Sequence, residues 1–408
     1  MRPIRHHLDH AATAPLRPDA RDAMVAAFDA GNPNSQYAEG RAARRILEDA
    51  RESIAADLGA EPVEVIFTSG GTEADNLGVR GLYLGSLADA PGAPSPGPGT
   101  VVTTPVEHDA IRKAVAHVAD HHGARVIEAP VDAGGRVVVA DLVERLRADA
   151  GEGAGTPAAD TEAQTTRHAV WTCQWANNET GAIQPIGEFI AAAGEFGAPV
   201  HVDAVQAIGH LPVDFHSTGA ATLAVSAHKF GGPRGIGALL VRRDAKVTPI
   251  LAGGGQERGL RSGTPDVAAA AGMAAALRAA TVGMGAEADR VGKLRDRLLA
   301  GVGELDGIVV HTTAPALPGH VHVSVPGAEG DSLIMLLDAA GISAATGSAC
   351  AAGVNRASHV LEAMGVAAPV SRGALRLTLG WNSTDSDVDA VLAVLGDTVA
   401  RARAAGMA

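Results

Sequence analysis

The chain has 408 residues, with 33 Lys and Arg against 46 Asp and Glu, which gives a formal net charge of −13. At about 150 residues per domain this length predicts two or three domains with a sizeable core, and it excludes a peptide or a small module. Hydrophobic residues make up 46% and charged residues 19%, values typical of globular proteins that exclude a collagen-like or disordered chain. The acidic balance argues against direct nucleic-acid binding, because that binding needs Lys and Arg to displace phosphate counterions.

The two cysteines are Cys173 and Cys350, and neither belongs to a Cys-x-x-Cys or Cys/His metal-binding pattern. Two cysteines are too few for a secreted disulfide framework, so we expect a reducing, cytoplasmic setting and no metal site. The N-terminus lacks the apolar core of a signal peptide, and we find no run of about 18 apolar residues without charge or proline. We therefore expect a soluble protein without a membrane interaction.

The first two thirds of the chain alternate between helical and strand patterns. Apolar residues at three-to-four spacing predict an amphipathic helix over 41–58. Short apolar or β-branched runs predict strands at 63–67, 101–104, 125–128, 169–172, 200–202, 222–225 and 237–241, mostly separated by alanine-rich stretches of helix length. Strands that alternate with helices indicate an α/β fold with a mostly parallel, doubly wound sheet.

After about Thr264 the pattern changes. Helical stretches near 266–281 and 286–304 are followed by alternating sequences at 320–325 and 374–379 that predict strands. We expect a large domain over 15–264 and a smaller α+β domain over 265–408 that includes residues 1–14. The stretches 89–99 and 150–164 are rich in Gly, Pro and Ala without periodicity, which predicts surface loops.

Lys229 follows a predicted strand and precedes a glycine-rich turn in the sequence SAHKFGG. An isolated lysine at such a place is usually a surface charge. Here, however, the preceding strand of the sheet ends in Asp203 and Gln206, and open α/β sheets bind ligands at this edge. A lysine that can form a Schiff base, with an acid that can pair with a pyridinium nitrogen, is what pyridoxal 5'-phosphate requires.

A phosphate group would need its own binding site, and the sequence TSGGTEADN over 68–76 offers one. Its Gly-Gly turn and Thr72 lead into a helix whose first amide groups and positive dipole suit an anion. The absence of a Gly-Lys-Ser/Thr ending speaks against a nucleotide-binding loop. Taken alone, this motif is also compatible with an ordinary helix N-terminus capped by threonine.

His108 and Asn178 also follow predicted strands. A single histidine at a strand end is more often structural than catalytic. With Thr72, His108, Asn178, Asp203, Gln206 and Lys229 all placed after successive strands, convergence on one pocket is the better explanation.

Ten segments together resemble the cysteine desulfurase family, group I type, of the fold-type I pyridoxal-phosphate enzymes in aminotransferase class V. They occur in the family's order along nearly the whole chain: LDHAATAPL, GNPNSQY, TSGGTEADN, VEHDAI, NNETGAIQPI, HVDAVQAIGHLPVDF, SAHKFGGPRGIGAL, GGGQERGLRSGTPD, TGSACAAG and LRLTLGW. The resemblance implies the large and small domains of that fold and a homodimer.

The resemblance also implies roles for individual residues. Lys229 would hold the cofactor and move the substrate α-proton, Asp203 would pair with the ring nitrogen, Gln206 would bind the ring hydroxyl, and His108 would stack on the ring. The implied cofactor-binding set is Gly71, Thr72, His108, Asn178, Asp203, Gln206, Ser226, His228, Lys229 and Thr264, with Thr264 coming from the other subunit. The implied substrate-binding set is Asn34, Asn178 and Arg376, with Arg376 binding the substrate carboxylate through two bonds.

Cys350, in TGSACAAG, would be the nucleophile that takes the sulfur as a persulfide, because the family carries this cysteine on a mobile loop. Its small, Gly-containing surroundings suit such a loop, although free cysteines are commonly buried. Cys173 lies inside a predicted strand and is expected to be an inert core thiol. The chain departs from the family pattern at His10, Tyr37, Ala351 and Ala352, which affects the detail of the loop and of acceptor docking and leaves the cofactor set intact.

The resulting hypothesis is a cysteine desulfurase that converts L-cysteine to L-alanine and passes sulfur from Cys350 to an acceptor, such as an iron–sulfur scaffold or a tRNA-thiolating enzyme. One alternative is another class V enzyme: an aminotransferase, a selenocysteine lyase or a cysteine sulfinate desulfinase. A second alternative is a non-catalytic sulfur-transfer scaffold, against which the presence of Lys229, Asp203 and His108 argues.

Overall fold

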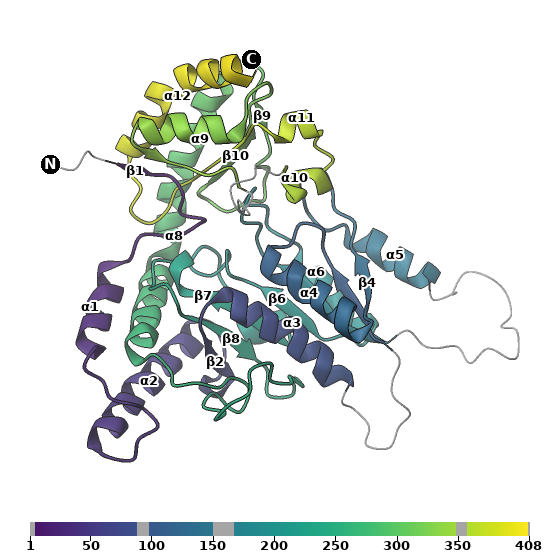
Figure 1. Cartoon of the computed structure of the whole chain (residues 1–408), viewed down its shortest axis with the longest axis vertical. Coiled ribbons are helices and arrows are strands. Elements are labelled where there is room, and N and C mark those ends of the chain that lie inside the picture. The colour runs from purple at the N-terminus through teal and green to yellow at the C-terminus, as the bar shows by residue number, and fades with distance from the viewer. Residues whose placement is uncertain (1–4, 88–97, 150–166, 348–356, 407–408) are drawn as a thin grey trace, which may run out of the picture.

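The computed structural model describes residues 5–87, 98–149, 167–347 and 357–406 (Figure 1). The predicted loop over 150–164, most of that over 89–99, and the candidate nucleophile Cys350 lie outside these residues.

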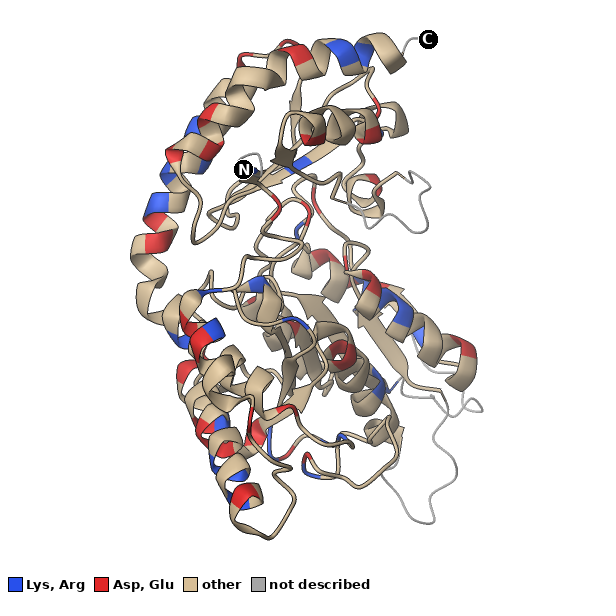
Figure 2. Ribbon diagram, turned by 60° about the vertical axis from the view of Figure 1, so that its left-hand side comes forward, with Lys and Arg blue, Asp and Glu red and all other residues tan. Residues whose placement is uncertain are grey.

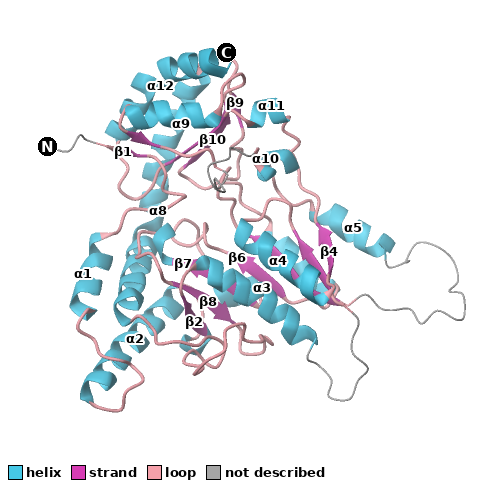
Figure 3. Cartoon of the chain, in the orientation of Figure 1, coloured by secondary structure: helices cyan, strands magenta, loops and turns pink. Residues whose placement is uncertain are grey.

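A seven-stranded sheet forms the centre of the larger part of the molecule, with strand order β2-β8-β7-β6-β5-β3-β4 (Figure 3). Its strands are β2 (Val65–Thr68), β3 (Thr100–Thr103), β4 (Arg125–Glu128), β5 (His168–Gln174), β6 (Val200–Asp203), β7 (Thr222–Ser226) and β8 (Gly237–Val241). β8 runs antiparallel to both of its neighbours, and the other described strands of the sheet are parallel. The predicted mostly parallel α/β sheet is confirmed.

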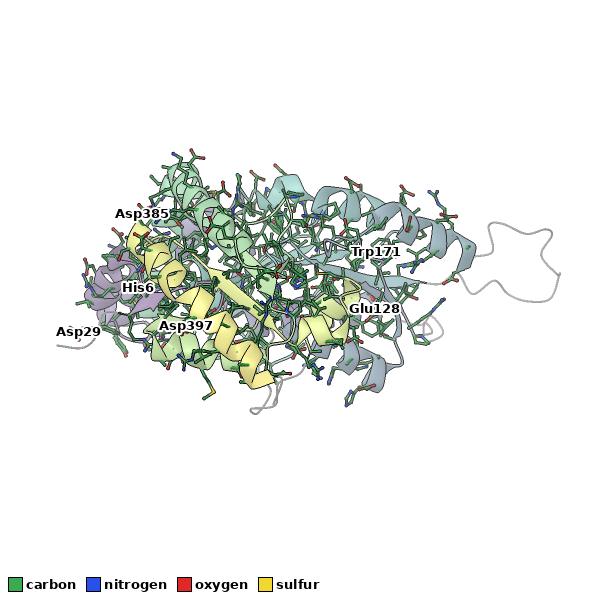
Figure 4. The ribbon with its side chains drawn as sticks, turned by 90° about the horizontal axis from the view of Figure 1, so that it is seen from above. His6, Asp29, Glu128, Trp171, Asp385 and Asp397 are labelled. Atoms are coloured by element: carbon green, nitrogen blue, oxygen red, sulfur yellow. The ribbon has the colours of Figure 1, made fainter. Side chains whose placement is uncertain are left out.

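Both faces of this sheet are buried, because successive side chains of a strand point to opposite faces. In β8, Ala238 and Leu240 join the core on one face, whereas Leu239 and Val241 join the core on the other. Trp171 of β5, labelled in Figure 4, is fully buried and packs against Phe189 of α6 (Ile186–Glu195). The helices of this part are α1 (Pro18–Ala27), α2 (Ala38–Asp57), α3 (Gly71–Leu87), α4 (Asp109–His122), α5 (Val139–Asp149), α6 (Ile186–Glu195) and α7 (Phe215–Thr218).

The first strand of the sheet begins two residues later than predicted. Pro62–Glu64 form a short 3-10 helix, and the predicted strand over 63–67 becomes β2 at Val65. The side chains of Glu61 and Glu64 bond each other's backbone amides in a capping box, which fixes this turn. Local capping therefore overrides the strand preference of the valine at its centre.

A second, three-stranded sheet of order β12-β10-β9 lies at the C-terminal end of the molecule. It consists of β9 (Val309–Val310), β10 (His320–Ser324) and β12 (Ala374–Thr378), and α9 (Gly330–Ala339) and α12 (Asp385–Gly406) pack with it in one core. Leu8 belongs to this core, and β1 (His6–His7) pairs with β11 (Ile342–Ser343). The short helices α10 (His359–Ala363) and α11 (Ala368–Ser371) complete this part.

The two helical stretches predicted near 266–281 and 286–304 are one continuous helix of 37 residues, α8 (Val267–Gly303). The prediction of two helices was wrong because the glycines at 283 and 285 do not interrupt the backbone. Residues 269–280 of α8 pack in the core of the large sheet, and Val291–Val302 contribute to the core of the small sheet. No linker therefore separates the two parts at 265, and the domain boundaries at 15 and 264 stay a prediction.

By length and composition alone α8 could cross a membrane, although Arg278 interrupts its apolar stretch, so the prediction that no run of about 18 apolar residues is free of charge and proline holds for this helix. In the structure 56% of its most apolar window is buried. The helix packs along α1 and α2, and Arg278 pairs with Asp57 at 2.9 Å. α8 is thus a core helix of this fold. In the view of Figure 2, acidic and basic residues are interspersed along the outer helices, as is typical of solvated helix faces.

Candidate active site

A cavity of about 240 Å³ lies at the carboxyl ends of the strands of the large sheet. Its lining includes nine of the predicted residues: Gly71, Thr72, His108, Asn178, Asp203, Gln206, Ser226, His228 and Lys229. The turns after β2, β3, β5, β6 and β7 supply them, so the predicted convergence of strand-end residues is present in the structure. Their individual roles stay predictions.

Lys229 ends a short 3-10 helix, η2 (Ala227–Lys229), which directly follows β7. Its Nζ donates a hydrogen bond of 2.6 Å to the carbonyl oxygen of Ala11. Burial, reinforced by the positive charge of Arg376, lowers the pKa of Lys229 to about 8. Near neutral pH an appreciable fraction of this amine is therefore uncharged and nucleophilic.

Asp203 is the last residue of β6 and is only 6% exposed. Its Oδ1 accepts a hydrogen bond of 2.9 Å from the amide of Val205. Burial raises the pKa of Asp203, while the neighbouring His108 and Lys229 act in the opposite direction. Gln206, one turn further on, donates through Nε2 to the same Ala11 carbonyl, at 2.9 Å.

His108 caps the N-terminus of α4 through its ring. Its Nδ1 accepts a hydrogen bond from the amide of Ala110 at 3.2 Å, so the neutral ring carries its proton on Nε2. Burial lowers the pKa of His108, which favours this neutral form. The flat, neutral ring lies in the wall of the cavity that also holds Asp203 and Lys229.

Part of the cavity lining is suited to an anion. α3 begins at Gly71, where a Cβ atom would lie 2.8 Å from Val205 and 3.2 Å from Ser226, so only glycine allows this close approach. The first amide groups of α3 and its positive dipole end face the same space as the hydroxyls of Thr72 and Ser226. Burial lowers the pKa of His228 to about 4, so at neutral pH its ring is neutral there.

A second cavity of about 660 Å³ shares His108, Asn178 and Lys229 with the first and is also lined by Arg376. Arg376 is 4% exposed; its Nη1 donates to the carbonyl of Asn178 and its Nη2 to Asp9, each at 2.7 Å. Its Nε has no hydrogen-bond partner in the described part of the chain. A buried guanidinium with a free donor is suited to bind a carboxylate.

Asn34 and Thr264, by contrast, are exposed and line neither cavity of this protomer. Cys350 lies outside the described residues, but Gly347, three positions before it, lines the second cavity. Cys173 is fully buried within β5, and burial raises its pKa far above the usual value, as expected of an inert core thiol.

Sequence reasoning missed several residues of this region. Ala11 supplies the carbonyl that binds Lys229 and Gln206, and Asp9 pairs with Arg376. Both belong to the segment LDHAATAPL. Because this segment is part of the family resemblance, it could have indicated a role in the site for each of them. Asp75 and Glu179 are buried acids that line the first and the second cavity, and no local pattern distinguishes them from surface acids.

The comparisons with known proteins agree with this geometry. The aminotransferase class-V family matches residues 6–391. An IscS-like cysteine desulfurase of Mycobacterium tuberculosis is 48% identical, with 98% of each chain covered. The cysteine desulfurase IscS of Dictyoglomus turgidum is 37% identical over 97% of this chain and 95% of its own. The solved structure of a NifS-like protein superimposes with a TM-score of 0.84 at 31% identity, covering 98% of this chain and all of the other. The chain therefore belongs to the cysteine desulfurases of the aminotransferase class-V family.

Proposed function

We propose that this protein is a pyridoxal-phosphate-dependent cysteine desulfurase. In the overall reaction, L-cysteine and the Cys350 thiol give L-alanine and a Cys350 persulfide. The substrate loses its C–S bond and gains a C–H bond, while a new S–S bond forms on the protein, so atoms and electrons balance. The observation that carries the proposal is the meeting of Lys229, Asp203, Gln206 and His108 in one cavity beside a helix N-terminus suited to an anion.

The donor set fits pyridoxal phosphate. Asp203 is a buried acid without a cationic side-chain hydrogen-bond partner among the described residues, which a protonated ring nitrogen would provide. Gly71, Thr72, Ser226 and His228 would hold the phosphate, Gln206 the ring hydroxyl, and Lys229 the aldehyde carbon. When bound, pyridoxal phosphate withdraws electron density from the Cα of an attached amino acid.

The protein's own residues then have separable tasks. Arg376 and Asn178 would bind and orient the substrate carboxylate. The Lys229 amine, with its pKa lowered to about 8, would take the proton from Cα and later return one to the product. The thiolate of Cys350, outside the described residues, would attack the substrate sulfur.

We also propose that the protein is a homodimer whose subunits complete each other's sites. Thr264 is exposed here, as expected if it faces the cavity of a partner copy, whereas the predicted substrate-binding role of Asn34 is not supported within this protomer. Large apolar side chains are exposed in α1 and between α1 and α2, with Val25 at 61%, Phe28 at 64% and Tyr37 at 59%. Exposed apolar groups of this size are typical of interfaces. We further propose a soluble, cytoplasmic enzyme that delivers its sulfur to an acceptor protein, an iron–sulfur scaffold or a tRNA-thiolating enzyme.

The test compares the wild-type protein with Cys350→Ala, both loaded with pyridoxal phosphate and supplied with L-cysteine and a reductant. We expect the wild type to release sulfide and alanine in equal amounts and the variant to release neither. If both yellow proteins are equally active, or both silent, Cys350 is not the nucleophile and another class V reaction must be sought with other amino acids. A protein that stays colourless with pyridoxal phosphate would instead support a non-catalytic scaffold.

A further inference from the structure

The carboxyl group of Glu179 lies between the two chain segments that flank residues 348–356. The N-terminal flank ends at Gly347, and the C-terminal flank begins at Ala357 and includes Ser358. Glu179 is 2% exposed and sits in the turn after β5, next to Asn178. The side chain of Asn177 fixes this turn, because its Oδ1 accepts hydrogen bonds of 2.9 Å from the amides of Glu179 and Thr180. The position of the Glu179 backbone is therefore set independently of its side-chain contacts.

Ser358 attaches the C-terminal flank to this carboxyl group. Its hydroxyl donates a hydrogen bond of 2.5 Å to Oε2 of Glu179 and also accepts one from the amide of Leu361, which caps α10. The neighbouring His359 makes a hydrogen bond of 2.9 Å through Nε2 with the carbonyl of Glu107, the residue before His108. The flank is thus tied to the turns that carry Asn178 and His108.

Gly347 brings the N-terminal flank to the same carboxyl group. A Cβ atom at this position would lie 3.1 Å from Oε2 of Glu179 and 3.2 Å from Nε2 of His322, and the backbone has a φ of +99°. Both features require glycine. Two residues earlier, Ala345 exchanges backbone hydrogen bonds of 2.6 and 3.2 Å with Arg376.

Two charged or titratable groups face Glu179 from the small sheet. Arg376 on β12 favours the ionised carboxylate, whereas burial opposes it and raises the pKa of Glu179 to about 7. His322 on β10 is fully buried, and burial lowers its pKa to about 3, so it is neutral at physiological pH. Neither His322 ring nitrogen makes a well-formed hydrogen bond within the described residues, although the backbone of Thr346 lies close enough to favour the protonated ring.

We propose that Glu179 is a positioning residue whose carboxylate holds the C-terminal flank of residues 348–356 through Ser358 and packs against the N-terminal flank at Gly347, beside the wall formed by Asn178 and Arg376, and that sulfur transfer to Cys350 requires this attachment. The inference rests on the proposed function, because it assigns Glu179 to the step at Cys350. Glu179 itself touches neither cofactor nor reacting atoms in this scheme. The hydrogen bond from Ser358 is strongest to the ionised carboxylate, so protonation of Glu179 loosens the attachment.

The first experiment uses the pyridoxal-phosphate-loaded protein and the variants Glu179→Gln and Ser358→Ala, with Glu329→Gln, at a half-buried glutamate outside both cavities, as the matched control. The readouts are the absorbance change on adding L-cysteine, the KM, and the single-turnover rate of Cys350 persulfide formation followed by mass spectrometry. We expect both test variants to lose about tenfold or more in the persulfide rate, while absorbance change and KM stay within about twofold of wild type. Test variants with the persulfide rate of Glu329→Gln would overturn the proposal, as would equal losses in every readout.

The pH profile supplies a signature that a merely structural role would not produce. In the wild type the persulfide rate should fall below about pH 8 as the Lys229 amine is protonated, and fall more steeply through about pH 7, because Glu179 is then protonated as well. In Glu179→Gln only the Lys229 limb should remain, and the rate should be low throughout. A second, steeper fall near pH 7 that persists in Glu179→Gln would belong to another group and contradict the proposal.

A final readout separates this inference from the proposed function. Iodoacetamide alkylates accessible thiols, and Cys173 is buried, so the alkylation rate of Cys350 can be measured without any turnover. If the flanks are held by Glu179, we expect Glu179→Gln and Ser358→Ala to change this rate several-fold relative to Glu329→Gln. Equal rates would refute the attachment even in an active desulfurase, whereas changed rates in a protein without desulfurase activity would support it and overturn only the proposed function.

Discussion

Burial of ionisable side chains dominates the chemistry of the candidate site at the scale of single residues. Asp203, Asp75 and Glu107 are buried acids with raised pKa values, and Lys229 is a base with a lowered one. Removal from water disfavours the charged form of each group, so acids and bases shift in opposite directions. The pKa of Glu107 rises to about 8, which keeps this acid neutral near physiological pH and leaves fewer negative charges to compete with Asp203.

The first prediction concerns the pH at which the apoprotein takes up pyridoxal phosphate. Only the uncharged Lys229 amine can attack the aldehyde, and the amine is freed as the pH rises through its pKa of about 8. The rate of covalent uptake should therefore rise roughly tenfold per pH unit at low pH and level off above about 8. Stopped-flow absorbance measures this rate, and a rise that continues to pH 10 would show an unperturbed lysine. Lys229→Ala should show no covalent uptake at any pH.

The second prediction concerns Arg376→Lys. Arginine reaches Asp9 and the Asn178 carbonyl with two nitrogens and keeps Nε free, whereas a lysine ammonium cannot make this planar set of bonds. We expect the KM for L-cysteine to rise about tenfold to a hundredfold, which corresponds to roughly 1.5–3 kcal/mol for a hydrogen bond to a charged group. Steady-state kinetics measure this, and the exposed Arg372→Lys is the control. A KM that matches the control would remove Arg376 from the substrate site.

At the scale of elements, the strand ends were predictable and the long-range contacts were not. The sequence placed His108, Asp203 and Lys229 after strands because apolar runs followed by polar residues are local patterns. The one continuous helix α8 was predicted as two because a pair of glycines reads as a break unless neighbouring helices support it. Asp9 and Ala11 reach the site from more than 200 positions away from Lys229, and no local pattern predicts such a contact.

The third prediction concerns the segment that leads to Thr264. Glu257 is 2% exposed and accepts hydrogen bonds from Arg51 of α2 at 2.8 and 2.9 Å and from the amide of Phe67 in β2 at 3.0 Å. Glu257→Gln removes the buried counter-charge of this guanidinium and leaves only the half-exposed Glu48, at 3.1 Å, which should lower the free energy of unfolding by about 3 kcal/mol. Urea unfolding of the cofactor-free proteins measures the loss. Glu52→Gln, on the exposed face of α2, should stay within about 0.5 kcal/mol of wild type, and equal midpoints for the two variants would contradict this account.

At the scale of the whole molecule, the proposed site lies where the two sheets meet. Lys229 and Asp203 come from the large sheet, Arg376 comes from the small one, and the N-terminal segment with Asp9 and Ala11 bridges them. α8 contributes to both cores and thereby fixes how the two parts face each other. Within one protomer, however, Thr264 and Asn34 are exposed and line neither cavity, so a single copy does not bring the whole predicted set together, and the proposed homodimer would supply Thr264.

The fourth prediction tests that second copy with a heterodimer of Lys229→Ala and Thr264→Glu subunits, co-expressed with two different tags and purified over both. If Thr264 acts in the partner's site, one of the two sites combines an intact Lys229 with an intact Thr264, and the other carries both substitutions. We therefore expect about half the wild-type activity, although each variant homodimer should be nearly inactive, because a carboxylate at 264 repels the phosphate. Sulfide release from L-cysteine measures the outcome. If Thr264 acted within its own subunit, neither site of the heterodimer would be intact, and activity would stay at the level of the homodimers.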